Sequence, residues 1–196
     1  MDTIIEIVSV VLGLAYLYFL IKEQVICWIF GILSSLLSIL LFYRSGLYSE
    51  SILYIYYVII GVYGFYYWNK RTSKNSAFEI TELPLKKYVL LILIGEILAL
   101  SMAFVFDNYT DANAPYLDAH TTIFSFIASF LEVKKYLASW KFWIVINGLT
   151  VFLYLDRGLN YYTGLTVVYL IFSFVGYIKW KKKFNTQKVT LNKSVL

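Results

Sequence analysis

The side chains of Trp143 and Asn147 have the types and the spacing to bind a flat polar molecule. Trp143 and Asn147 lie four residues apart in "WKFWIVINGLTVFLY", so they share one face of a helix. An aromatic plane beside an amide can stack on a heterocycle while the amide bonds its polar edge, and the plane also favours a cationic ring. Alternatively, Asn147 forms a hydrogen bond to a neighbouring helix.

A second set of polar residues follows the helical period within "YLDAHTTIFSFIASFLEVKKY". Its members recur at intervals of 4, 3, 4 and 3, namely Asp118, Thr122, Ser125, Ser129 and Glu132. Such a stripe should face away from lipid. Thr122 and Ser125 could line a substrate pathway, although small hydroxylated residues also allow close helix packing. Asp118 and Glu132 are expected near the two mouths, in contact with water.

Tyrosines are concentrated in "YSESILYIYYVIIGVYGFYYW", residues 48–68, which holds seven of them. A hydroxyl in the middle of an apolar segment must find a partner. Glu50, Tyr54 and Tyr57 are spaced to share one face. They are either ligand contacts in a polar interior or packing residues bonded to neighbouring carbonyls.

The remaining reactive residue types predict no catalysis. Glu96 stands alone at the centre of an apolar run, where a structural bond or a subunit contact is expected rather than proton coupling. His120 has no second His or Cys nearby and is not expected to bind metal. Cys27 is expected to be a packing residue. No phosphate loop or nucleophile–base pair is present, so neither an enzyme nor a cofactor is predicted.

The elements that must position these residues are membrane spans. Of the 196 residues, 60% are hydrophobic and 15% charged, with a mean hydropathy of +0.70. A helix needs roughly 20 apolar residues to cross a bilayer. Seven runs qualify, at about 4–21, 25–43, 50–68, 88–106, 117–137, 141–155 and 160–178. The first run lacks the basic flank and cleavage site of a secretory signal, so we expect it to be retained.

Basic residues divide unequally between the two sides that seven spans define. Fifteen Lys and Arg fall on one side, and only Arg44 and Arg157 fall on the other. Basic residues are retained in the cytoplasm, which places the amino terminus outside and the carboxyl terminus inside. The net charge of +5 then needs no nucleic-acid partner. Lys179 to Lys183 are expected to lie beside anionic lipid headgroups.

The second half of the chain matches the first when the sequence is shifted by 112 residues. Trp28 then meets Trp140 and Trp68 meets Trp180, and the other matches include Gly64 with Gly176, Tyr57 with Tyr169, and Ser35 with Asn147. We therefore predict an all-α membrane protein of two parallel three-helix repeats joined by a linker helix, a 3+1+3 order. The predicted segments are 1–70, 71–112, 113–182 and a polar tail at 183–196. A substrate site is expected near the midplane, between the two bundles.

The motifs together resemble the Pnu vitamin transporters, whose founding activity is uptake of nicotinamide riboside. The resemblance rests on "WIFGILSS" from Trp28, the tyrosine-rich segment from Tyr48, the polar stripe, and "WKFWIVIN" through "GYIKW" ending at Trp180. It implies a SWEET-like fold in a bacterial cell membrane, a homotrimer of independent pores, and facilitated diffusion with trapping of the substrate by a cytoplasmic kinase. Trp143 and Asn147 match site residues of that family. This chain has Ile29 where nicotinamide riboside members commonly have Pro, and Tyr54 where they have Gln.

The leading hypothesis is a passive carrier of nicotinamide riboside or a related nucleoside, such as a deoxyribonucleoside, that works by rocking of the two bundles. Thiamine and riboflavin are alternative substrates, and a membrane scaffold without transport is the alternative class. The principal site is predicted from Trp28, Ser35, Tyr54, Trp143 and Asn147. Further candidate contacts are Glu50, Tyr57, Thr122, Ser125 and Tyr169.

Overall fold

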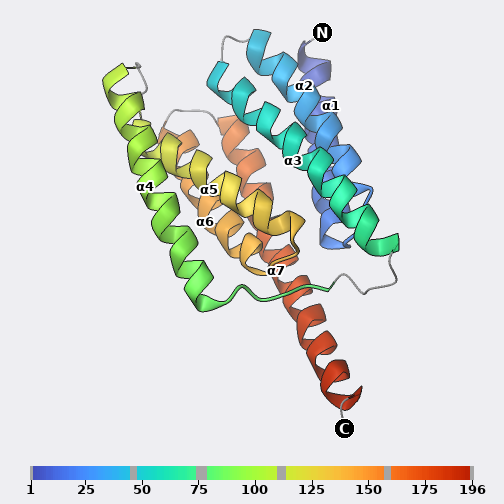
Figure 1. Ribbon diagram of the computed structural model, residues 1–196. Helices are drawn as coiled ribbons and strands as arrows, with labels where there is room; N and C mark the ends of the chain where they lie inside the picture. Colours follow the sequence, from blue (N-terminus) through green and yellow to red (C-terminus); the bar gives the residue numbers. More distant parts are fainter. Residues whose placement is uncertain (1, 45–47, 74–78, 110–113, 157–159, 195–196) are drawn as a thin grey trace. The chain divides into compact units, whose positions relative to one another are not determined.

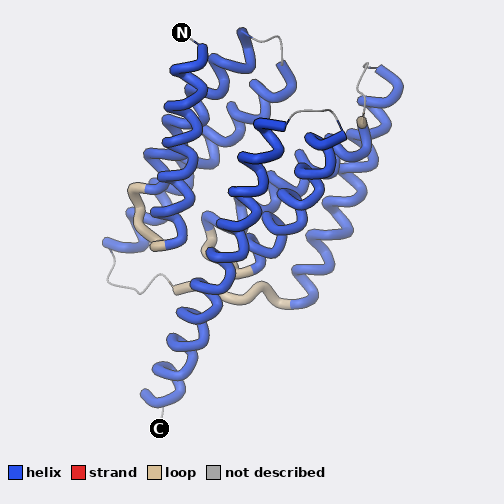
Figure 2. Tube along the Cα trace, turned by 180° about the vertical axis from the view of Figure 1, so that it is seen from behind, coloured by secondary structure: helices blue, strands red, loops and turns tan. Residues whose placement is uncertain are grey.

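The structure is a computed structural model that describes residues 2–44, 48–73, 79–109, 114–156 and 160–194. Within these ranges the chain forms seven helices: α1 (Asp2–Ile21), α2 (Cys27–Arg44), α3 (Tyr48–Ser73), α4 (Leu85–Tyr109), α5 (Pro115–Val133), α6 (Ala138–Asp156) and α7 (Asn160–Ser194). Figure 2 shows the same helices from behind. Each predicted span falls largely on one helix, and Pro115 begins α5 as its position in the sequence indicates.

The chain divides into two compact units, one with α1–α3 and one with α4–α7. In the first unit, α2 packs against both α1 and α3. In the second unit, α5 packs between α4 and α6, and α6 also packs against α7. The helix predicted as a linker, α4, is thus part of the second unit.

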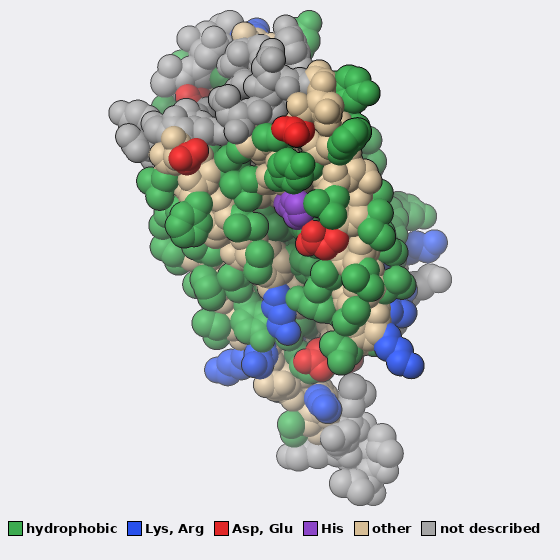
Figure 3. Space-filling view, turned by 90° about the vertical axis from the view of Figure 1, so that its left-hand side faces the viewer, with side chains coloured by type: hydrophobic (Ala, Val, Ile, Leu, Met, Phe, Trp, Pro, Cys, Tyr) green, Lys and Arg blue, Asp and Glu red, His purple; other side chains and the backbone are tan. Residues whose placement is uncertain are grey.

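Among the described residues, five helices are long and apolar enough to cross a membrane, namely α1, α2, α4, α6 and α7. The chain is therefore a multi-pass membrane protein, and hydrophobic side chains cover most of the face shown in Figure 3. Helix α3 carries the seven tyrosines and α5 carries the polar stripe. These two helices therefore hold polar groups of the kind that a ligand site in the membrane needs.

The turns after α1 and α5 have the same backbone geometry. Glu23 and Lys135 both have positive φ, 57° and 54°. The amide of Glu23 donates to the carbonyl of Leu20, and that of Lys135 to Glu132, both at 2.9 Å. The next amide in each turn reaches back five residues, which completes a Schellman ending. The fifth helix consequently ends at Val133, four residues before the end predicted for that span.

A tryptophan packs on a glycine in each unit. The Trp28 ring lies over Gly64 and meets the Trp68 ring edge-on, at 5.4 Å between centroids and 87° between planes. The Trp140 ring lies over Gly176 and meets Trp180 at 5.4 Å and 85°. All four indoles are at most 2% exposed. These contacts join α2 to α3 and α6 to α7 at their closest approach.

Small residues bring the other helix pairs together. In the first unit the hydroxyl of Ser9 lies 2.8 Å from that of Ser38 and bonds the carbonyl of Ser34, which joins α1 to α2. In the second unit Gly95 lies against Phe124, where a Cβ on Gly95 would stand 2.8 Å from the ring. Ala99, buried one turn further along α4, continues this contact with α5.

The segment before α4 is attached to the turn between α5 and α6. The amide of Thr81 donates to the carbonyl of Lys135 at 3.1 Å, and the amide of Leu137 donates to the carbonyl of Thr81 at 2.9 Å. Ile80 beside it is 1% exposed. This pairing closes the end of the second unit over the last turn of α5.

Helix α7 is 35 residues long and continues to Ser194. It passes the predicted end of its span at residue 178 and includes most of the segment predicted as a polar tail. Its last part extends beyond α4–α6 and ends at the carboxyl terminus (Figure 1). That extension is rich in lysine.

Candidate functional site

The indole of Trp143 on α6 is bonded to a buried acid on α5. Its Nε1–H donates to Oε2 of Glu132 at 2.7 Å. Glu132 is 2% exposed, although the sequence predicted it at a water-filled mouth. That prediction was wrong because α5 ends at Val133 and the chain folds back over its last turn. The bond orients the Trp143 ring, which is partly buried against the apolar core of the unit.

Asn147, one turn after Trp143, is bonded to the helix on the other side. Its Nδ2 donates to the hydroxyl of Ser173 on α7 at 3.0 Å, and that hydroxyl donates to the carbonyl of Tyr169 at 2.9 Å. The Ser173 hydroxyl donates its only proton to the Tyr169 carbonyl, so its oxygen must accept the hydrogen bond from Asn147. This fixes the orientation of the Asn147 amide. The Oδ1 of Asn147 makes no hydrogen bond to the described residues.

These four residues form what we name the second-unit cluster: Glu132, Trp143, Asn147 and Ser173. They come from α5, α6 and α7, with α6 in the middle. The two interpretations weighed for Asn147 are compatible, since its amide nitrogen bonds Ser173 and its oxygen is left to accept from a ligand. Sequence reasoning did not identify Ser173, which lies in an apolar run and is 2% exposed.

The polar stripe of α5 is turned into the second unit. Ser125 and Ser129 are each 4% exposed, and Thr122 is half-buried. The Ser129 hydroxyl donates to the carbonyl of Ser125 at 2.8 Å, a bond within its own helix. The hydroxyls of Thr122 and Ser125 make no hydrogen bond to the described part of the chain. They are therefore available to a polar ligand, which a hydroxyl in an apolar environment needs.

The candidates in the first unit have different surroundings. Trp28 is 2% exposed and its ring is occupied by Gly64 and Trp68, so it acts as a core residue. Ser35 is 6% exposed, and its hydroxyl has no partner among the described residues.

Two tyrosines of α3 lie side by side in an aromatic cluster. The Tyr54 ring meets Tyr57 edge-on at 5.5 Å and lies 5.2 Å from Phe42 on α2. Tyr169 on α7 is half-buried, and its carbonyl accepts the bond from Ser173. Glu50 belongs to α3, but its side chain lies outside the described part of the structure.

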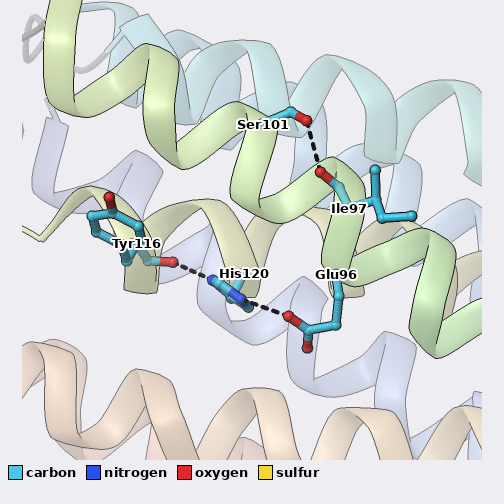
Figure 4. Close-up of polar contacts among 5 residues, drawn as sticks. All are labelled: Glu96, Ile97, Ser101, Tyr116 and His120. Carbon is cyan, nitrogen blue, oxygen red and sulfur yellow. Dashed lines mark hydrogen bonds and ion pairs between the residues drawn. The ribbon is translucent and has the colours of Figure 1, made fainter.

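A second polar contact joins α4 to α5 through residues that do not belong to the second-unit cluster. Figure 4 shows this contact. His120 Nε2 lies 3.0 Å from Oε2 of Glu96, and His120 Nδ1 lies 2.6 Å from the carbonyl of Tyr116. A carbonyl only accepts, so Nδ1 carries a proton. One further proton must lie between Nε2 and the carboxyl group, as imidazolium with carboxylate or imidazole with carboxylic acid. This bond agrees with the structural role expected for Glu96.

No group of three or more His, Cys, Asp or Glu side chains within the described ranges could hold a metal ion. The polar chemistry of the second-unit cluster is therefore that of an aromatic face, an amide and a carboxyl group. Such a set recognises a flat polar molecule by stacking and hydrogen bonding.

Comparisons with known proteins identify relatives of this chain. A model of the family described as nicotinamide mononucleotide transporter matches residues 3–182. The nicotinamide riboside transporter PnuC of Escherichia coli (strain K12) is 24% identical over 196 residues, which cover 87% of this chain and 81% of that protein. PnuC of Neisseria mucosa is 29% identical over 192 residues, which cover 92% and 73%.

A solved structure, described as the crystal structure of the vitamin B3 transporter PnuC, has the same fold. It matches with a TM-score of 0.78 and 25% sequence identity, and the match covers 94% of this chain and 83% of that one. With the family match over residues 3–182, these findings confirm the resemblance to the Pnu vitamin transporters. The chain belongs to the nicotinamide mononucleotide transporter family, a family of membrane transporters and not of enzymes.

Proposed function

We propose that this chain carries nicotinamide riboside, or a closely related nucleoside, into the cell by facilitated diffusion. The observation that carries the proposal is the pair of Trp143 and Asn147 on one face of α6. Trp143 is fixed by Glu132, and Asn147 keeps an unbonded carbonyl oxygen. A carboxamide or a base edge that offers an N–H group would satisfy that oxygen while its ring stacks on the indole.

Unpaired hydroxyls on α5 support a ligand with a sugar. Thr122 and Ser125 have no hydrogen-bond partner among the described residues, whereas the hydroxyl of Ser129 does. A ribose presents several hydroxyls that both donate and accept. Their pairing with these side chains is a proposal that follows from the chemistry of the two groups.

Tyr54 leaves the choice among related substrates open. Tyr54 occupies the position where nicotinamide riboside transporters of this family commonly have Gln. Its ring lies in the aromatic cluster with Phe42 and Tyr57. An aromatic ring stacks on any flat heterocycle, so a deoxyribonucleoside, thiamine or riboflavin is the second candidate.

Uptake into liposomes tests the transport mechanism. Purified protein should let nicotinamide riboside equilibrate, so that uptake stops when the inside and outside concentrations match, with or without a proton or sodium gradient. Glu96→Gln should still equilibrate the ligand, because Glu96 bonds His120 and does not belong to the second-unit cluster. Accumulation driven by a proton gradient, and lost in Glu96→Gln, would contradict facilitated diffusion. Binding without any uptake would favour the scaffold alternative.

We further propose that the two units contain parallel three-helix repeats, α1–α3 and α5–α7, with α4 between them. Three features recur at a distance of 112 residues in support. These are the left-handed residues Glu23 and Lys135, the Trp–Gly contacts, and the edge-on tryptophan pairs. A chance similarity of two helix bundles would not reproduce both a backbone turn and a side-chain contact at one offset.

The proposed orientation has the amino terminus outside and the carboxyl terminus in the cytoplasm. Its support is the uneven distribution of basic residues, with Arg44 and Arg157 alone on the outer side. A protease-cleavable tag after Leu196 should be accessible only from the cytoplasm, and a tag before Met1 only from outside. Both tags on one side would contradict this orientation. The homotrimer and the trapping kinase implied by the resemblance stay predictions.

A further inference from the structure

Holding the Trp143 indole in place requires a hydrogen-bond acceptor, but it does not require an ionisable residue such as Glu132. A neutral amide or hydroxyl could also accept the Trp143 N–H. A carboxyl group at 2% exposure in the unit instead carries a large desolvation cost if it is ionised. Its neighbours in sequence, Leu131 and Val133, are buried and apolar, and the buried Ser129 and Lys135 stand three residues before and after it. An ionisable side chain at such a place in a membrane protein is a functional candidate.

The bond to Glu132 also changes what the Trp143 ring can bind. The face of an indole carries negative charge and attracts cations, and tryptophan is the strongest of the aromatic side chains in this respect. The Glu132 oxygen accepts the N–H at 2.7 Å, and an acceptor in the ionised form pushes electron density into the ring. The carboxylate and the ring face then both favour a positive charge on a stacked ligand.

We propose that Glu132 makes the second-unit cluster selective for a ligand whose aromatic ring is positively charged. This inference rests on the proposed function, because it assumes that a ring stacks on Trp143. It adds that the ring is recognised by its charge as well as its shape. The ring of nicotinamide riboside, a pyridinium, has this charge, whereas its dihydro form keeps the sugar and carboxamide on a neutral ring.

Lys135 is a buried basic residue that could oppose this effect. It follows Glu132 by three residues and is 6% exposed. If its ammonium group fully compensated Glu132, the cluster would be electrically neutral, and charged and neutral rings would bind alike. The two possibilities therefore differ in a measurable preference.

The test compares binding of nicotinamide riboside and of its dihydro form to purified protein by titration calorimetry. Wild-type protein should bind the charged form about tenfold more tightly, the range that a desolvated cation–π contact gives. Glu132→Gln keeps an oxygen that accepts the indole bond but removes the charge. It should weaken binding of the charged form by about tenfold and change binding of the neutral form less than about twofold. Glu82→Gln, which removes an exposed carboxylate before α4, is the matched control and should change neither.

A spectroscopic measurement reports on the bond itself. The protein is labelled with ¹⁵N-tryptophan for NMR. The indole N–H signal that is present in wild-type protein and absent in the Trp143→Phe variant belongs to Trp143. This signal should lie downfield in wild-type protein and move upfield in Glu132→Gln, because a neutral acceptor withdraws the proton less. A signal that does not move would contradict an anionic Glu132.

The binding outcomes separate this inference from the proposed function. Wild-type protein that binds neither form would contradict both. Wild-type protein that binds the two forms equally, or an equal loss for both forms in Glu132→Gln, would contradict the charge selectivity alone and leave Glu132 as a residue that only positions the ring.

Discussion

Asn147→Leu should weaken the binding of nicotinamide riboside by about tenfold or more. Leu has a similarly branched side chain but cannot accept a hydrogen bond, so the ligand N–H that met Oδ1 would be left unpaired. Leaving such a group unpaired costs about 1–3 kcal/mol, and 1.4 kcal/mol is a factor of ten. Titration calorimetry on folded, monodisperse protein measures the change.

Thr150→Val is the matched control on the same helix. The Thr150 hydroxyl bonds the carbonyl of Ile146 within α6, so its loss should leave the affinity unchanged. Ser173→Ala should have an intermediate effect, because it removes the partner that fixes the Asn147 amide. Unchanged affinity in a folded Asn147→Leu protein would place the ligand elsewhere.

Gly176→Ala should lower the thermal stability of the protein strongly, and Gly64→Ala should do the same. A Cβ at Gly176 would lie 2.5 Å from the Trp140 ring, and one at Gly64 would lie 2.6 Å from the Trp28 ring. Neither ring can move aside easily, because both are buried and held edge-on by a second tryptophan. Overpacking of this kind costs about 1–3 kcal/mol or more. Thermal unfolding in detergent, followed by size-exclusion chromatography, gives the comparison.

The sign of the effect distinguishes packing from helix propensity. Alanine is the better helix former by about 1 kcal/mol, so a glycine without close neighbours should gain stability on the same change. Gly164 on α7 has open space around it and is the control. Gly164→Ala should be neutral or stabilising. A Gly176→Ala protein as stable as Gly164→Ala would show that the α6–α7 contact is looser than described here.

The hydropathy of the sequence was sufficient to locate the helices, because each helix could be recognised from the apolar residues of its own segment. The end of α5 was not predictable in this way. Its stop is a left-handed Lys135, where most helices with this ending have glycine, so nothing in "LEVKKYL" indicates a turn. The predicted span continued to residue 137, and this placed Glu132 at a mouth instead of inside the unit.

Candidate site residues could be selected from the sequence where their own type is unusual for a membrane span. Trp143 and Asn147 were identified by type and spacing, and the structure gives each a defined partner. Those partners were missed for a physical reason. Glu132 lies on α5 and Trp143 lies on α6, so the helical period cannot relate them. Ser173 corresponds to Gly61 under the 112-residue shift, so the internal similarity did not mark it as polar.

The rise per residue of helix α7 sets the distance between each of its lysines and the membrane surface. Its 35 residues span about 52 Å at 1.5 Å per residue, and a bilayer core takes up only about 30 Å. Electrostatic attraction to a charged surface fades within about 8 Å at physiological salt, the rise of about five residues. Counted from the buried Trp180, Lys181 to Lys183 lie inside that distance, and Lys188 lies about 12 Å along the axis. Neutralising Lys188 would therefore lower the net charge of the protein with little change in its attraction to anionic lipid, whereas neutralising Lys182 would change both.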